Sequence, residues 1–210
     1  MAEPKQTHAR SQVENLFSGL CAGACAGTLG ARLLLGDAAP SWALKATSIQ
    51  YSAETTGTFA AGLDDAYGVA FMAALLTVLR KFFMEMVLAP LAKLGGVKPG
   101  TDRIKFKQQG WVLVYYSTAF AWGLSEILGS SYWLDTAALW RGYPHTASMT
   151  ASFKMYFISQ LAFWIHMVFV TLVEPWQKDF VVMIIHHFIT IGMLVLQNAS
   201  FAASPHCLTA

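Results

Sequence analysis

Apolar residues gather into five long stretches that alternate with more polar connections. The stretches cover residues 16–35, 67–88, 111–128, 155–173 and 180–201. Each approaches or reaches the roughly 20 residues that an α-helix needs to cross the hydrocarbon core of a bilayer. The pattern predicts an all-α, polytopic transmembrane protein with about five membrane spans. The segment 130–154 is too polar to span, and its Trp and Tyr residues are typical of a chain that lies along the membrane surface.

The first stretch is rich in small residues. Gly19, Gly23 and Gly27 recur every four residues and therefore form one stripe along a helix. Such a stripe lets a second helix approach closely, and we expect it to pack inside the same chain. A cleaved signal peptide is the alternative interpretation, because Lys5 and Arg10 precede the apolar run.

The second stretch carries charges in its latter half. Glu85 follows Lys81 by four residues, so the two share one face of a helix and are expected to pair. Arg80 and Lys81 are expected to extend their charged ends towards the membrane interface. This pattern is typical of a charge-paired helix end.

The distribution of basic residues predicts how the chain is oriented. The connection 93–107 has the densest positive charge, which is typical of the cytosolic side. Alternation then puts the N-terminus and the connection 174–179 in the cytosol, and residues 36–65 in the lumen. The last span starts on the cytosolic side, so His186 lies about six residues, or roughly 10 Å, below its start.

Composition agrees with a membrane protein and excludes some other classes. Hydrophobic residues make up 55% of the 210 residues and charged residues 12%, whereas a soluble domain carries about 25% charged residues. The formal net charge is +2, and no basic cluster is interleaved with aromatic residues, so nucleic acid is not expected as a partner. Cys21, Cys25 and Cys207 imply neither a disulfide framework nor a metal motif.

The most informative polar residues are His186 and His187, which are adjacent within the last apolar stretch. Ionisable side chains are costly in hydrocarbon, and those that occur there usually have a function. Thr190 lies on the neighbouring turn, where it is expected to bond one imidazole and fix its tautomer. His166 is expected at a similar depth, because the short connection 174–179 predicts an antiparallel helical hairpin.

Three interpretations of the histidine pair compete. An imidazole can act as a general base or nucleophile, because it titrates near neutral pH. A metal site is disfavoured, because one bare pair supplies too few ligands. A structural histidine bonded to a backbone carbonyl is the third interpretation. Two consecutive histidines within one span favour the catalytic role, and neither a metal nor a bound cofactor is expected.

Several short stretches between about Gly62 and Leu194 match one known family in their order and spacing. They are Gly62-Leu-Asp-Asp-Ala-Tyr67, Lys105-Phe-Lys-Gln-Gln-Gly-Trp111, Tyr115-Tyr116-Ser117, Tyr132-Trp-Leu-Asp-Thr136, Leu139-Trp-Arg-Gly-Tyr-Pro144, Lys154-Met-Tyr156, Gln160-Leu-Ala-Phe-Trp164, Lys178-Asp-Phe180, and Met183 with His186-His187-Phe-Ile-Thr190. Taken together, they resemble the ceramide synthases, the longevity-assurance branch of the TLC-domain family.

The resemblance implies a multi-pass enzyme of the endoplasmic reticulum membrane that transfers a fatty acyl group from acyl-CoA to the amine of a sphingoid base. In that family the histidine pair is catalytic, so His186 and His187 take this role by position. Asp179, which belongs to a matching stretch, is a supporting residue together with Thr190 and His166. Acyl-CoA, the sphingoid base and the bilayer are the expected partners, and an oligomer with itself or with ceramide synthase subunits is a further expectation.

The sequence departs from the family's pattern in two places. Trp176 and Gln177 stand where the family has basic residues after the loop glutamate. The likeness also fades after about Leu194, before the family's second acidic motif. We therefore expect a truncated product with weak or no activity.

The expected organisation has three parts: an N-terminal region at 1–61, a partial TLC-type domain at 62–194 and a divergent tail at 195–210. The alternative function is that of a non-catalytic TLC-type membrane protein that binds lipid or pairs with a full-length synthase.

Overall fold

A computed structural model describes residues 4–53, 57–130, 133, 135, 149–174 and 179–202. Its elements in chain order are α1 (Pro4–Leu35), the 3-10 turn η1 (Gly36–Ala38), α2 (Ser41–Thr47), β1 (Ser52–Ala53), β2 (Thr58–Phe59), α3 (Asp65–Phe83), the π-helical turn η2 (Met84–Leu88), α4 (Ala89–Leu94), α5 (Thr101–Leu128), α6 (Ala151–Val173) and α7 (Phe180–Ala202). The prediction of an all-α protein is confirmed, with one antiparallel ladder that joins the short strands β1 and β2.

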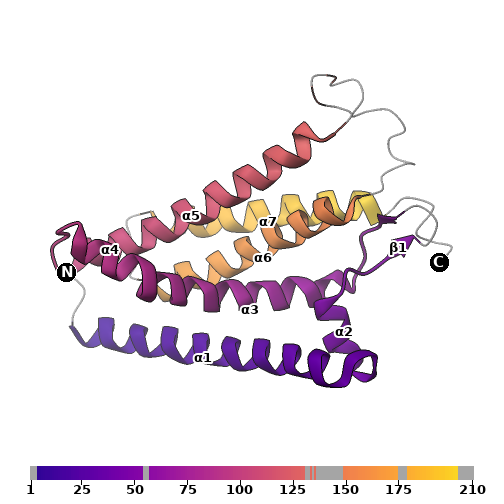
Figure 1. The fold of residues 1–210 in the computed structure, drawn as a ribbon. Coiled ribbons are helices and arrows are strands. Elements are labelled where there is room, and N and C mark those ends of the chain that lie inside the picture. The colour runs from indigo at the N-terminus through magenta and orange to yellow at the C-terminus, as the bar shows by residue number, and fades with distance from the viewer. Residues whose placement is uncertain are drawn as a thin grey trace.

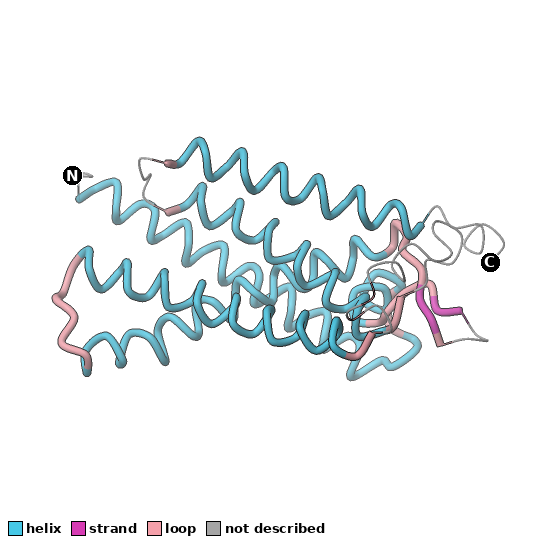
Figure 2. The backbone as a smooth tube through the Cα atoms, turned by 90° about the horizontal axis from the view of Figure 1, so that it is seen from above, coloured by secondary structure: helices cyan, strands magenta, loops and turns pink. Residues whose placement is uncertain are grey.

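The long helices α1, α3, α5, α6 and α7 lie lengthwise beside one another (Figure 1). The N-terminus and α4 lie at one end of this bundle, while α2 and the two strands lie at the other (Figures 1 and 2). Helix α5 leans away from α6 and α7 towards its C-terminal end (Figure 1). This up-and-down arrangement agrees with the alternation expected from the apolar stretches.

Three of the described helices are long and apolar enough to cross a membrane: Ser11–Ala38, Ala151–Val173 and Phe180–Asn198. The other two expected spans, 67–88 and 111–128, do form helices (α3 with η2, and α5), but they are not among these three. Helix α5 begins ten residues before the predicted span, at Thr101. The number of five spans is therefore not confirmed, although the five helices are present in the bundle.

Some predictions lie outside the described residues. They concern most of the segment 130–154, the connection residues 175–178 and the tail residues 203–210. The described chain resumes at Met149, whose backbone N–H and C=O both bond Phe59. Because Phe59 is in β2, this bridge fixes the start of α6 beside the strands.

Helix α6 is at the centre of the packing. Ala162 and Phe163 are fully buried, and they contact apolar side chains from α3, η2, α5 and α7. The Phe163 ring stacks on Tyr115 of α5, with ring centroids 3.5 Å apart and planes 4° from parallel. These contacts hold α6 in position, and α6 in turn determines where α7 packs.

The π-helical turn η2 ends two residues before Pro90. Pro90 cannot donate a backbone N–H, and its ring crowds the carbonyl four residues earlier. A wider turn over Met84–Leu88 relieves that crowding and lets the helix continue into α4. Leu88 then packs against Gly110 of α5, where an added Cβ would come within 2.8 Å of the Leu88 side chain.

The glycine stripe of α1 does not pack inside the chain, so that prediction is wrong. Gly19, Gly23 and Gly27 are exposed, and an added Cβ at each would meet nothing within 4 Å. The helix instead buries the neighbouring stripe of small polar and thiol side chains, which consists of Ser18, Cys21, Cys25 and Thr28. This choice lets Phe17 stack on Phe169 of α6, with ring centroids 3.5 Å apart. Burial of that aromatic surface favours this face over the glycine face.

Candidate active site

His186 and His187 lie on α7, two turns after its start, and face different surroundings. The His187 side chain is fully buried, whereas His186 is exposed. Adjacent residues of a helix point about 100° apart, so one imidazole enters the contact between α7 and α6 while the other stays at its border. The pair therefore combines one enclosed ring with one accessible ring.

The tautomer of His187 follows from its hydrogen bond. Its Nδ1 is bonded to the backbone carbonyl of Met183, one turn earlier. A carbonyl oxygen only accepts, so Nδ1 must carry the proton, and Nε2 keeps its lone pair. Nε2 is buried and has no hydrogen-bond partner among the described residues. The Nε2 of His187 is thus an unprotonated, basic nitrogen that is buried beside α7.

Trp164 of α6 contacts both imidazoles. Its ring centroid lies 5.5 Å from that of His186 and 5.4 Å from that of His187. From the sequence, Trp164 was recognised only as the last residue of the stretch Gln160-Leu-Ala-Phe-Trp164. Its contact with both histidines was not predicted. The predicted hairpin contained part of the signal. Trp164 lies ten residues before Glu174 and the pair lies seven and eight residues after Asp179, so their distances from the connection differ by less than one helical turn.

His166 does not join the pair. Its Nδ1 lies 2.9 Å from the Thr77 hydroxyl of α3, and that hydroxyl donates to the backbone carbonyl of Ala73. The His166 Nδ1 must therefore donate to Thr77, which leaves its Nε2 unprotonated. That atom is buried and has no partner in the described part of the chain. His166 is thus a second intramembrane imidazole, and it faces α3.

Thr190 and Asp179 act on the backbone of α7. The Thr190 hydroxyl donates to the His186 carbonyl at 2.9 Å, not to an imidazole as expected, because a threonine in a helix readily bonds the carbonyl four residues earlier. The Asp179 carbonyl accepts from the Met183 N–H at 2.9 Å and so begins the first turn. The Asp179 side chain is exposed at the N-terminal end of α7, where a negative charge is favourable.

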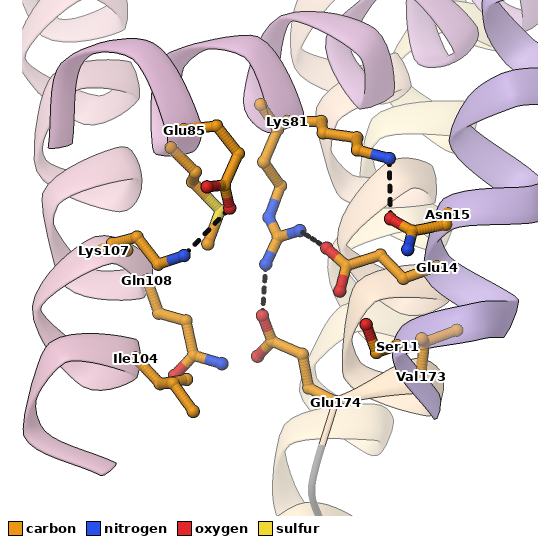
Figure 3. Close-up of a pocket in the computed structure, with 12 residues that line it drawn as sticks. Ser11, Glu14, Asn15, Lys81, Glu85, Ile104, Lys107, Gln108, Val173 and Glu174 are labelled. Carbon is orange, nitrogen blue, oxygen red and sulfur yellow. Dashed lines mark hydrogen bonds and ion pairs between the residues drawn. The ribbon is translucent and has the colours of Figure 1, made fainter. Parts of the chain in front are cut away.

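A charged pocket lies at the end of the bundle where α1 begins and α6 ends. Figure 3 shows Glu14 and Glu174 approaching Arg80 from α1 and from the end of α6. The Arg80–Glu14 distance is 2.7 Å, and the Arg80 side chain is only 7% exposed. Arg80 therefore joins three helices from a buried position. The expectation that Arg80 and Lys81 extend towards the membrane interface stays a prediction.

The predicted pair of Lys81 and Glu85 does not form. Lys81 donates to Asn15 of α1 at 2.7 Å, and Glu85 pairs with Lys107 of α5 at 2.9 Å (Figure 3). Partners on neighbouring helices replace the partner on the same helix, because Glu85 lies in the wider turn η2 and other helices pack on both sides. The pocket enclosed by these groups has a volume of about 230 Å³.

Burial raises the pKa of Glu174, and the neighbouring Arg80 guanidinium opposes this shift. Glu174 follows the last residue of α6, so it lies at the end of the membrane-length segment. The two effects act against each other on one carboxyl group. Its ionised form therefore depends on the contact with Arg80.

A second buried charge lies at the opposite end of the bundle. Lys154 of α6 pairs with Asp65 of α3 at 2.8 Å, and both side chains are at most 5% exposed. The ammonium group also donates to the backbone carbonyls of Gln50 and Ala60. Asp65 and Lys154 belong to two different stretches that match the family, and the fold brings them into contact.

No group of three or more His, Cys, Asp or Glu side chains arranged for a metal ion occurs in the residues that the structure describes.

Comparison with known proteins identifies a domain in the second half of the chain. Residues 105–202 match the sequence profile of the TLC domain. The chain carries a TLC domain. The match includes α5, α6 and α7, and it extends beyond Leu194, where the resemblance was expected to fade.

Curated relatives are similar over most of the chain. The sphingosine N-acyltransferase-like protein ALT7 of Alternaria alternata is 34% identical over 148 residues, which are 70% of this chain and 34% of the relative. Ceramide Synthase FUM18 of Gibberella moniliformis is 34% identical over 68% of this chain and 33% of its own length. Ceramide synthase LAG1 of Saccharomyces cerevisiae is 28% identical over 70% of this chain and 36% of its own length. The chain therefore spans about a third of the length of these relatives.

Proposed function

We propose that this chain provides the histidine-bearing part of a sphingosine N-acyltransferase site, which transfers a fatty acyl group from acyl-CoA to the amine of a sphingoid base. The observation that carries the proposal is the imidazole pair on a membrane-length helix, in which the Met183 carbonyl sets the His187 tautomer and the His187 Nε2 has no partner among the described residues. Two of the similar proteins are named as a ceramide synthase and one as a sphingosine N-acyltransferase-like protein.

The chemistry requires a base near the membrane. The amine nitrogen attacks the thioester carbonyl carbon, so that a C–N bond forms and the C–S bond breaks. The attacking nitrogen loses a proton, and an imidazole can take it and return it to the departing thiolate sulfur. His186 is the accessible ring and meets the substrate, while His187 lies against it with ring centroids 6.0 Å apart. No bound cofactor takes part, since acyl-CoA is a co-substrate.

The supporting residues take narrower roles than the sequence indicated. Thr190 anchors the carbonyl of His186, Asp179 begins α7, and His166 ties α6 to α3. We assign none of them to proton transfer.

The proposal places the chain in the endoplasmic reticulum membrane with the Arg80 pocket on the cytosolic side. This orientation follows from the basic residues of 93–107, and the contacts of Arg80 put the starts of α1 and α5 at that same end. A glycosylation acceptor inserted between α2 and β1 should be modified, whereas one inserted between α4 and α5 should not. The reverse result would invert the orientation.

The main experiment measures ceramide formed from acyl-CoA and dihydrosphingosine. Membranes would carry this chain by itself, and a chimaera in which its residues replace the matching stretch of the Gibberella moniliformis ceramide synthase. We expect the chimaera to be active, and His186→Ala and His187→Ala each to abolish product. Full activity in both variants would remove the proposed site.

A second candidate function is association with a full-length synthase without turnover. The exposed glycine stripe of α1 favours it, because small residues on an outer face permit close helix contact in a membrane. Co-purification with a tagged full-length relative, lost on Gly23→Leu and without ceramide formation by the chimaera, would support this function over the first.

A further inference from the structure

The histidine pair raises a geometric problem that the backbone does not solve. Two adjacent helical side chains diverge by about 100°, yet a shared site needs both rings in defined orientations. His187 is restrained by the Met183 carbonyl. Among the described residues, the His186 ring makes ring contacts with Trp164 and His187.

Trp164 contacts both imidazoles from a different helix. Its plane is 76° from the His186 plane and 83° from the His187 plane, and the two imidazole planes are 87° apart. The three rings are thus mutually close to perpendicular. Edge-to-face contacts of this kind are a favoured arrangement of aromatic rings, so each ring restrains the rotation of the other two.

Trp164 is itself held by the core. It follows the fully buried Phe163 and packs against the same apolar cluster. Its side chain has few alternative rotamers there, because protein interiors are close-packed. Because the Trp164 indole is held in place on α6, it restrains the orientation of the two imidazole rings on α7.

We propose that Trp164 is the positioning residue of the imidazole pair, acting through the ring of His186 above all. The inference rests on the proposed function for its catalytic meaning, but the ring arrangement can be tested without acyl transfer. A misplacement of about 1 Å at a reacting group can lower a rate about 100-fold, so the orientation of the accessible ring determines whether the pair functions.

The test is the rate at which diethyl pyrocarbonate carbethoxylates each histidine of this chain in membranes, followed by peptide mass spectrometry. Trp164→Leu removes the aromatic contact, and Trp164→Phe keeps an aromatic ring. Trp111→Leu is the matched control, because Trp111 is a buried tryptophan of the same core with no recorded ring contact to either imidazole. His166, buried against α3, reports on the integrity of the fold within the same sample.

We expect Trp164→Leu to raise the carbethoxylation rate of His186 several-fold, with Trp164→Phe and Trp111→Leu close to the unsubstituted chain and His166 unchanged in all. The proposal is overturned if Trp164→Leu has no effect, if Trp111→Leu has the same effect, or if Trp164→Leu raises all three histidines equally, since Trp164 would then act on the whole fold. Loss of the proposed acyl transfer would leave these labelling rates unaltered, so the two proposals can fail separately.

Discussion

Two buried ionisable side chains, Lys154 and His187, differ in how completely they are satisfied. Lys154 directs its ammonium group at three acceptors, the Asp65 carboxylate and two backbone carbonyls. His187 makes one hydrogen bond and keeps a buried nitrogen without a partner among the described residues. A buried polar group left unpaired is costly. The saturated group is therefore expected to serve stability, and the unsaturated group to serve chemistry.

The largest expected effect is on catalysis. His187→Ala should lower the turnover of the chimaera by about 10²–10⁴-fold, the range typical of lost proton-transfer catalysis, because His186 then loses the ring that lies against it. The loss of thermal stability should be smaller than that caused by Lys154→Met. The measurement is the rate of ceramide formation beside the melting temperature in detergent. Ile189→Ala is the control, because Ile189 is exposed on the same helix. A His187→Ala variant that melts much earlier would place His187 with Lys154 on the structural side of the comparison.

Removal of the saturated charge should have the opposite profile. Lys154→Met leaves the Asp65 carboxylate buried and unpaired, which should cost about 3–5 kcal/mol of unfolding free energy. The neighbouring pair of Lys45 and Asp64 is an internal control, because its side chains are 37% and 33% exposed and exposed pairs contribute about 0–1 kcal/mol. Chemical unfolding of Lys154→Met and Lys45→Met measures the difference. Equal stability of the two would contradict a structural role for Lys154.

His166 resembles His187, because it has one bonded nitrogen and one buried nitrogen without a partner among the described residues. Thr77→Val should cost about 1–3 kcal/mol, because the imidazole then loses its bond across α3 and α6. Thr171→Val, which removes a hydroxyl bonded only to its own helix at Met167, is the control. If Thr77→Val lowered turnover as much as His187→Ala at unchanged stability, His166 would belong to the reactive group.

The smallest effect is expected at Thr190. Thr190→Val removes one bond to the backbone of His186 and should cost less than about 1 kcal/mol, since a single neutral hydrogen bond contributes about that much. Turnover should change less than about fivefold, the rate change that corresponds to about 1 kcal/mol. Thr118→Val on α5 removes an equivalent bond to Val114 and is the comparison. A large loss of turnover would show that Thr190 bonds a substrate or an imidazole during the reaction.

The sequence predicted the helices far better than the contacts between them. The apolar stretch 180–201 nearly coincides with α7, and 155–173 with most of α6, because burial in lipid and in the core both select continuous apolar runs. The start of α5 was missed since Lys105 and Lys107 interrupt that pattern. The partners of Arg80 were also missed. Glu14 lies 66 residues before it and Glu174 lies 94 residues after it, and only the packing of three helices brings them together.

The candidate site shows the same difference between residues that the sequence identified and contacts that it did not predict. His186 and His187 were found because two imidazoles in an apolar run are conspicuous. The tautomer of His187 and the contact with Trp164 were not found, because both depend on which face of α7 meets α6. The sequence also could not show which stripe of α1 is buried. Small residues make up both the glycine stripe and the neighbouring stripe, so the pattern of small residues does not distinguish them.

The wide turn over Met84–Leu88 has a consequence for tolerance to insertions and deletions. Arg80 and Lys81, which precede the turn, bind side chains of α1. Leu88, the last residue of the turn, packs against Gly110 of α5. Loss of one residue there would rewind the turn to ordinary helical pitch and rotate everything downstream by roughly a quarter of a revolution. Leu88 would then no longer face Gly110, and Glu85 would point away from Lys107. Length is therefore constrained more tightly at this point than the identity of any single side chain within it.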